Sequence, residues 1–221
     1  MQKITIASNL SALIPKLELS CIECDIVLET KNERLWDVIL QKVTELNAEL
    51  KVEQISQLPA IASSRKAYKL CGKDPARYRL SAEALLRRVL KRKEIYQVNN
   101  AVDLLNLVSI SSGFSIGGYD AEKINGHVEF GIGRSDEPYE GIGRGELNIE
   151  FMPVFRDRTG AFGTPTSDSV RTCVTNDTKR FLMVIINYGT SSLSLAAQMA
   201  IDLLKEYAQA TNIELKTISG Q

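Results

Sequence analysis

The chain contains a single histidine, His127, so any Ser–His–Asp or Cys–His mechanism would have to use it. His127 lies in the alternating segment G-H-V-E-F, which is typical of a surface or edge strand. A histidine-ligated metal site lacks ligands for the same reason. These residues therefore predict neither a nucleophilic triad nor a histidine-bound metal.

Cys21 and Cys24 have the C-x-x-C spacing of zinc and redox sites. They lie in L-E-L-S-C-I-E-C-D-I-V-L, which has the character of a strand, and residues three apart on a strand point to opposite faces. Cys71 and Cys173 have no second cysteine at short spacing. We therefore expect buried thiols, with no metal and no cofactor.

The segment T-P-T-S-D-S-V-R-T, residues 164–172, concentrates short polar side chains. Its Ser167, Asp168, Ser169 and Arg171 would suit an anion-binding loop, or a turn whose side chains satisfy their own backbone. The residues alone leave both interpretations open. The glycine-rich stretch E-G-I-G-R-G-E-L lacks the G-x-G-x-x-G spacing and no helix follows it, so it does not predict dinucleotide binding.

Asp103 and Asn106 are three positions apart in a helix expected from Asn99 or Asn100 to about Gly113, so they share one face. Two polar residues on one face of an apolar helix form either a solvent-exposed surface or the polar wall of a pocket. Further on, Thr178 is expected at the entrance of a buried strand over residues 180–187.

The charge of the chain is balanced, with 27 Lys and Arg against 27 Asp and Glu, but it is unevenly placed. Eleven Lys or Arg and only two acids, Asp74 and Glu83, lie between Arg65 and Lys93. This basic segment indicates a local polyanion footprint, for which Arg87, Arg88, Lys91 and Arg92 are the candidate phosphate contacts. The cations also suit the C-terminal end of their helix, which is a purely structural reason for them.

The sequence patterns of strands and helices that must position these residues indicate one globular domain of 221 residues that contains both. We expect a strand over residues 16–28, a helix over 31–50, a helix start at Asp74-Pro75, and a helix over 82–93 capped by Ser81. Pro59 argues against a continuous helix over residues 57–68. Bent strands over 126–155, a helix over 193–210 and a strand over 213–218 complete the chain. No apolar run reaches the ~18 residues of a membrane span and no signal-peptide core is present, so a cytoplasmic location is expected.

Four motifs occur in one order: V-N-N-A-V-D-L-L-N-L-V-S, G-F-S-I-G-G-Y-D, I-N-G-H-V and V-T-N-D-T-K-R-F-L. In this order and spacing they resemble the B3/B4 module of the bacterial phenylalanyl-tRNA synthetase β subunit, and the whole chain resembles stand-alone versions of that module. The resemblance implies an α+β fold in three layers, with mixed β-sheets in a sandwich flanked by helices. It spans residues 72–188, flanked by a strand–helix extension (1–71) and a C-terminal helix and strand (189–221) of a single domain.

The resemblance also implies a pocket that binds and hydrolyses mischarged aminoacyl-tRNA by positioning a water. Its residues would be Asn106, Gly117 and Thr178, with substrate contacts from Asp103, Tyr119 and Asp120. From the polar segment 164–172, Asp168, Ser169 and Arg171 are further candidates for substrate contacts. Gly117 stands where the synthetase module commonly has histidine, and a residue this small would enlarge or reshape the pocket.

The leading hypothesis is therefore a trans-acting editing hydrolase whose partner is tRNA or aminoacyl-tRNA, with no DNA and no membrane. The alternatives are a non-catalytic RNA-binding module and a protein that binds a free amino acid. Ligase activity is not expected, because the chain has no adenylate-forming motif. The cognate tRNA, the amino acid and the oligomeric state are left open.

Overall fold

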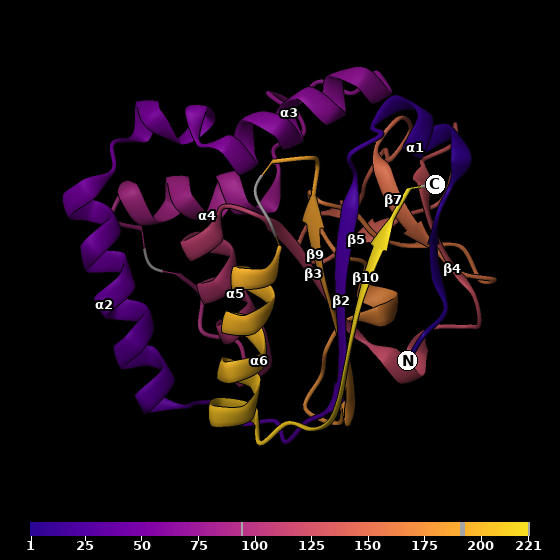
Figure 1. Ribbon diagram of the computed structural model, residues 1–221. Helices are drawn as coiled ribbons and strands as arrows, with labels where there is room; N and C mark the ends of the chain where they lie inside the picture. Colours follow the sequence, from indigo (N-terminus) through magenta and orange to yellow (C-terminus); the bar gives the residue numbers. More distant parts are fainter. Residues whose placement is uncertain (94, 191–192, 221) are drawn as a thin grey trace.

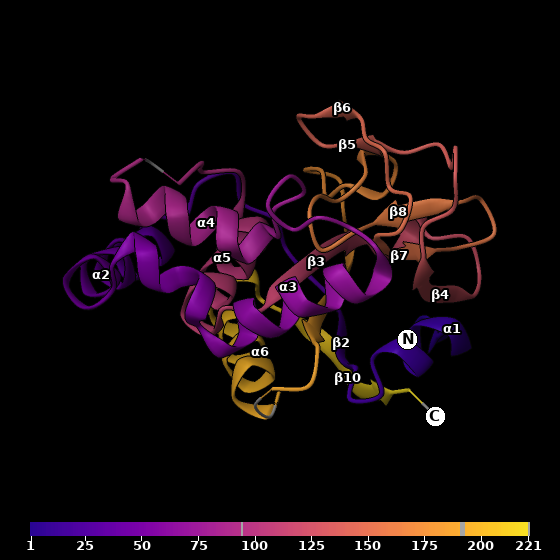
Figure 2. The ribbon, with the colours of Figure 1, turned by 90° about the horizontal axis from the view of Figure 1, so that it is seen from above.

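Three layers make up the molecule: a group of helices, a central sheet and a second sheet (Figures 1 and 2). The computed structural model describes residues 1–93, 95–190 and 193–220. The expected three-layer α+β arrangement is confirmed.

The central sheet is antiparallel throughout, whereas the second sheet is mixed. The central sheet has the order β10 (Thr211–Ser219), β2 (Glu18–Asp25), β9 (Arg180–Asn187) and β3 (Ser115–Asp120). The second has the order β1 (Ile4–Ile6), β4 (Val128–Ile132), β7 (Pro153–Arg156) and β8 (Ala161–Gly163), in which only β1 and β4 are parallel. A hairpin of β5 (Glu140–Gly141) and β6 (Gly145–Glu146) projects beyond it (Figure 2).

The helices lie mainly on one face of the central sheet. Helices α4 (Ser81–Leu90), α5 (Asn100–Ser112) and α6 (Ser194–Ala208) pack on its strands, and α2 (Glu33–Glu49) packs outside α4 and α5. Helix α3 (Pro59–Cys71) runs from this layer to α1 (Ser8–Leu13) beside the second sheet (Figure 2). Short 3-10 helices η1 (Val52–Gln57), η2 (Ala121–Lys123) and η3 (Val170–Thr172) complete the elements of the described residues. None of the described helices is long and apolar enough to cross a membrane.

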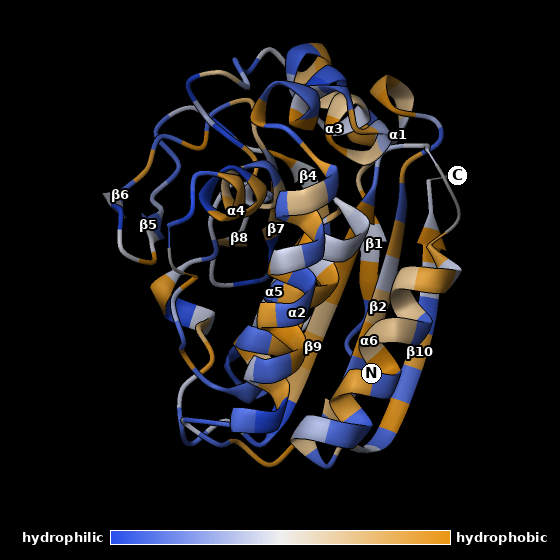
Figure 3. Ribbon diagram, turned by 90° about the vertical axis from the view of Figure 1, so that its left-hand side faces the viewer, coloured by the Kyte–Doolittle hydropathy of each residue, from blue (hydrophilic) through white to orange (hydrophobic). Residues whose placement is uncertain are grey.

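Strand β9 forms the centre of two cores because its side chains alternate between the faces of the sheet. Phe181, Met183 and Ile185 join the core under the helices, and Leu182, Val184 and Ile186 join the core between the sheets. In Figure 3 both β9 and α5 are coloured mostly hydrophobic, whereas α2 alternates between hydrophobic and hydrophilic residues. An outer helix with one apolar face requires this pattern.

The same alternation separates Cys21 from Cys24, as expected: Cys21 lies between the sheets and Cys24 lies under the helices. All four cysteines are free thiols. Burial raises the pKa of Cys21 and Cys24 to about 12 and that of Cys71 to about 11, so these thiols are unreactive. Cys173 is half-buried, contrary to expectation, because it follows η3 at the surface. The described residues contain no cluster of three or more His, Cys, Asp or Glu that could hold a metal ion.

Three helix starts differ from the sequence expectation. Pro59 begins α3 instead of interrupting it, because the first helical position needs no backbone N–H donor. Asp74 and Pro75 form a turn, in which Asp74 Oδ1 accepts from the Ala76 N–H at 2.9 Å, and no helix follows. Ser81 is the first residue of α4 and not its cap, which is Leu80.

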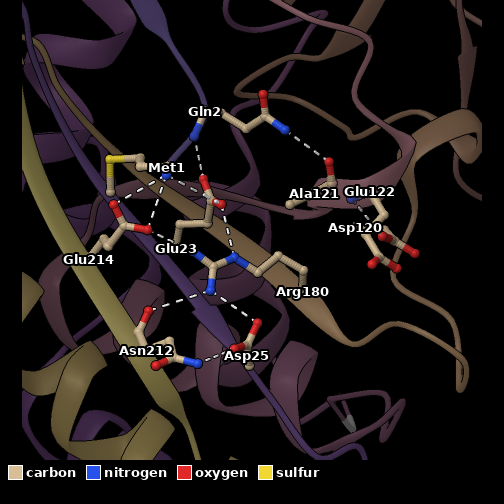
Figure 4. A network of polar contacts seen from close by, with 10 residues as sticks. All are labelled: Met1, Gln2, Glu23, Asp25, Asp120, Ala121, Glu122, Arg180, Asn212 and Glu214. Carbon is tan, nitrogen blue, oxygen red and sulfur yellow. Dashed lines mark hydrogen bonds and ion pairs between the residues drawn. The ribbon is translucent and has the colours of Figure 1, made fainter.

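A network of ion pairs around Arg180 joins three strands of the central sheet (Figure 4). The guanidinium of Arg180, on β9, contacts Glu23 at 2.9 Å and Asp25 at 3.0 Å on β2, and Glu214 at 2.8 Å on β10. The Met1 amino group contacts the same Glu214 at 3.0 Å. These ion pairs therefore connect β9, β2 and β10 near the end of β9 at which its apolar residues begin.

A second ion-pair group joins α3 to α4. Glu83, in the first turn of α4, is only 1% exposed and accepts from Arg65 Nη1 at 2.8 Å and from Arg87 Nε at 2.9 Å. Arg79 Nε lies 3.7 Å from the same carboxylate. One buried acid thus fixes three cations of the basic segment.

Glu83→Gln is expected to lower the free energy of unfolding by about 2–4 kcal/mol, because the arginines lose their buried counter-charge. Glu33→Gln, which removes an exposed acid from the first turn of α2, is the matched control and should change it by less than about 0.5 kcal/mol. Chemical denaturation of both variants measures the difference. Equal effects of the two substitutions would show that the arginines do not depend on Glu83.

Candidate functional site

Asp103 and Asn106 lie on α5 as expected, but Asp103 belongs to the packing between helices. Asp103 is 1% exposed, and its carboxylate accepts from Trp36 Nε1 at 3.1 Å and from the Val98 N–H at 3.0 Å. Burial raises the pKa of Asp103, and these two donors act in the opposite direction. Asn106 is half-buried. Asp103 therefore positions Trp36 of α2.

The space beside Gly117 is filled by the side chain of Tyr119. A Cβ atom on Gly117 would lie 2.0 Å from Tyr119 Oη, and one on Gly163 of β8 would lie 2.2 Å from the same atom. The ring also packs edge-on against Phe162, with centroids 5.0 Å apart. The expectation that Gly117 enlarges a pocket is therefore wrong: the glycine makes room for a tyrosine.

Asp168 is half-buried, and its carboxylate points inward next to this tyrosine. Its Oδ2 accepts from the Gly118 N–H at 3.3 Å, while its Oδ1 and Tyr119 Oη are buried without a hydrogen-bond partner of good geometry among the described residues. Burial raises the pKa of Asp168 from 3.8 to about 7, although the Gly118 contact favours the charged form. Gly117, Tyr119 and Asp168 are thus brought together, but in a closed interior.

Thr178 and Asp120 bond to each other at the start of β9. Thr178 Oγ1 donates to Asp120 Oδ2 at 2.8 Å and accepts from the Thr175 N–H at 3.0 Å. Lys123 Nζ lies 3.3 Å from the same Asp120 oxygen. Both side chains are buried and satisfied, which makes this pair a structural clamp on the β9 entrance.

Residues 164–172 form the turn that was one of the two sequence interpretations. Thr164 Oγ1 accepts from the N–H groups of Thr166 and Ser167, at 3.2 and 3.0 Å, and Ser169 Oγ accepts from the Arg171 N–H at 3.2 Å. The Arg171 guanidinium forms two bonds with Asp157, at 2.9 and 3.0 Å. The positive charge of Arg171 is therefore balanced by the carboxylate of Asp157.

A cavity of about 1120 Å³ lies between the β5–β6 hairpin, the turn after β7 and η3, and Ser169 and Arg171 line it. Asn106, Gly117 and Thr178 do not line it. Its other walls were not predicted, because they come from the hairpin region: Arg134, Tyr139, Glu140 and Glu146. Tyr139 is held in place by its hydroxyl, which donates to the Ser167 carbonyl at 2.6 Å. The only signal in the sequence was the repeated G-I-G-R, which lies at the start of this segment (residues 131–134) and in the β5–β6 turn (residues 141–144).

The cavity has a surplus of negative charge. Glu137 is neutralised by Arg156 at 2.7 Å, and Arg171 by Asp157. The remaining charged residues that line the cavity in the described chain are one cation, Arg134, and three acids, Asp136, Glu140 and Glu146. Glu140 and Glu146 are direct partners across the hairpin, so their charges add at one place. Such a surface attracts an ammonium group.

One residue of the basic segment, Lys73, reaches the wall of this cavity. The buried Lys73 donates to the carbonyls of Asn148 and Glu150, at 3.0 and 2.7 Å, and Asn148 lines the cavity. Of the four candidate phosphate contacts, Arg87 is bonded to Glu83, and the Arg88 guanidinium lies 4.0 Å from the Tyr96 ring centroid. Lys91 and Arg92 are exposed.

Gly117→Ala is expected to lower the free energy of unfolding by about 2–3 kcal/mol, because its methyl group overlaps the Tyr119 ring. Gly141→Ala is the control, since its nearest neighbour is the movable Ser167 Oγ at 3.2 Å. A double-mutant cycle with Tyr119→Ala, followed by urea denaturation, should give a much smaller loss for Gly117→Ala in the Tyr119→Ala background. A loss that is unchanged there would rule out this steric explanation.

The raised pKa of Asp168 predicts a pH-dependent stability. Between about pH 4 and pH 7 the folded chain holds a proton that the unfolded chain has released, so this group stabilises the fold at low pH and the stabilisation is lost as the pH rises to 7. Asp168→Asn should therefore gain stability relative to the parent chain across this window, by at most about 1.4 kcal/mol per pH unit. Unfolding curves at pH 5 and pH 8 check this, and a pH-independent difference would contradict it.

The B3/4 domain family model matches residues 63–209, about two thirds of the chain. No curated protein matches the sequence. Among solved structures, an N-terminal fragment of the phenylalanyl-tRNA synthetase beta subunit from Pyrococcus horikoshii aligns with a TM-score of 0.46 at 14% identity, over 98% of this chain and 50% of that one. The chain thus spans about half the length of that fragment. On the extent of the family match, the chain belongs to the B3/4 domain family.

Proposed function

We propose that this chain binds aminoacyl-tRNA and that the cavity beside η3 receives the acylated end. The observation that carries this proposal is an acidic cavity, lined by Ser169 and Arg171, in a chain whose basic segment contacts the cavity wall through Lys73 and continues along α4. Membership of the B3/4 family and the sequence resemblance to the synthetase module support a role connected with tRNA.

The two charged surfaces match the two ends of this ligand. The phosphates of a tRNA are polyanionic and suit exposed cations such as Lys91 and Arg92. The α-amino group of an aminoacyl ester is an ammonium, which suits Glu140 and Glu146. A cavity of about 1120 Å³ has room for an aminoacyl-adenosine, since pockets for ligands of drug size measure roughly 300–1000 Å³.

Hydrolysis of a mischarged ester is the reaction that we propose for this site. A water positioned by polar groups can attack an ester without a protein nucleophile, and positioning of this kind gives large accelerations. Tyr139, Ser169 and Arg171 are polar side chains that line the cavity beside η3 and the 164–172 turn. The residues expected from the resemblance, Asn106, Gly117 and Thr178, have no part in this proposal, because they do not line the cavity.

Filter binding with charged and uncharged tRNA tests the function. The parent chain should prefer the charged form, with an affinity that falls steeply as salt increases. The double variant Glu140→Gln, Glu146→Gln should lose the preference for charged tRNA by about five- to tenfold and keep its affinity for uncharged tRNA. Glu122→Gln, an exposed acid in η2, is the control and should change neither.

A deacylation assay on several mischarged tRNAs then decides between the hypotheses. Release of the amino acid above background supports editing. Binding without release supports a non-catalytic RNA-binding module. Thermal stabilisation by a free amino acid, with no binding to any tRNA, would replace the proposed function with that of an amino-acid-binding protein.

A further inference from the structure

A groove of about 370 Å³ lies between α2 and the end of α4, away from the acidic cavity. Its walls are apolar, with Trp36, Leu40 and Val43 from α2 and Val89 from α4. Arg92 and Lys93 line it as well, and none of its described lining residues is acidic. The groove therefore combines a flat aromatic and aliphatic surface with two positive charges.

Trp36 is held in a defined orientation within this groove. Its Nε1 donates to the buried Asp103 at 3.1 Å, so the polar edge of the indole is satisfied inside the protein. The rest of the ring contributes apolar surface to the groove. Trp36 is the single tryptophan of the chain. An aromatic ring fixed by a hydrogen bond binds a planar ligand at a low cost in conformational entropy.

Arg92 occupies a backbone position that favours glycine. It has φ 53°, the Arg92 N–H bonds to the Val89 carbonyl at 2.9 Å, and the Lys93 N–H bonds to the Arg88 carbonyl at 3.0 Å. These two bonds form a Schellman motif, in which the left-handed residue is usually glycine and the flanking contact is usually apolar. Here the sequence places cations at these positions, although a non-glycine residue costs stability there. Positive charge suits the C-terminal end of the helix, but the left-handed backbone gives no reason for a side chain at position 92.

We propose that this groove binds one unpaired nucleotide of an RNA strand, with the base on Trp36 and its phosphate at Arg92 and Lys93. Aromatic surfaces combined with cations are the general means of binding single-stranded nucleic acid, because every base has a flat face and every linkage a negative charge. The groove volume of about 370 Å³ suits a ligand of the size of one nucleotide. This inference rests on the proposed function, since it names where an unpaired part of the tRNA docks. It extends beyond the residues matched by the family model, because α2 precedes residue 63.

The test uses a dye-labelled single-stranded RNA hexamer and a blunt-ended RNA hairpin with no unpaired end. The hexamer should quench the fluorescence of Trp36 and bind, whereas the hairpin should not quench it. Arg92→Gly should weaken hexamer binding several-fold and reduce the slope of log K against log salt by about 0.7. The same substitution should leave the melting temperature unchanged or raise it, because glycine suits the left-handed backbone. This separates loss of binding from loss of fold.

Two further variants complete the design. Trp36→Leu should weaken hexamer binding by about tenfold or more, measured by anisotropy of the dye. Lys216→Ala, an exposed cation on β10, is the matched control and should change neither binding nor its salt dependence.

The outcomes distinguish this inference from the function on which it rests. If charged tRNA binds through the cavity but the hexamer neither quenches Trp36 nor responds to Arg92→Gly, the groove proposal is overturned and the proposed function stands. If neither tRNA nor hexamer binds, both fail. Quenching by the hairpin, or concentration-dependent dimerisation that buries Trp36, would show that the groove takes a duplex or a second copy of the chain instead.

Discussion

Strand β9 is covered by helices on one face of its sheet and by the second sheet on the other, so its interior residues have no access to water. A strand in this position must be apolar at every place, since an unpaired polar group there costs several kcal/mol. Residues 181–186 are all apolar. The polar residues lie at the two ends of the strand, Arg180 and Asn187, and just before it, Thr178. The ion pairs around Arg180 and the bond between Thr178 and Asp120 are consequences of this placement.

The interior between and beside the sheets contains polar groups as well, and only some of them are hydrogen-bonded, since Tyr119 Oη and Asp168 Oδ1 have no partner among the described residues. Tyr119 lies between two glycines, Asp168 is held by a backbone N–H, and the Tyr68 hydroxyl meets Thr166 Oγ1 at 2.9 Å. Side chains of this size leave no room for a ligand between them. The open site lies farther out, where the β5–β6 hairpin stands away from the second sheet and leaves its charged residues accessible.

Much of the fold could be predicted from the sequence because it rests on local patterns. Apolar periodicity identified α2 and α6, and the continuous apolar run identified β9. Pro59 was misjudged because the same residue interrupts a helix in the middle and begins one at the first position, and only the neighbouring packing decides which. The site was harder. Nothing local to Gly117 indicates that the ring of Tyr119 turns back over it, and the cavity is assembled from segments that are distant along the chain.

The four thiols differ in their accessibility in a way that is useful for experiment. Cys21, Cys24 and Cys71 are enclosed in the cores, whereas Cys173 lies at the surface directly after η3, the element that borders the acidic cavity. The native chain therefore offers one position for a thiol-directed spectroscopic label, without any cysteine having to be removed. A probe attached there reports on its local environment, and so on the arrival of a substrate, from within a few residues of Ser169 and Arg171.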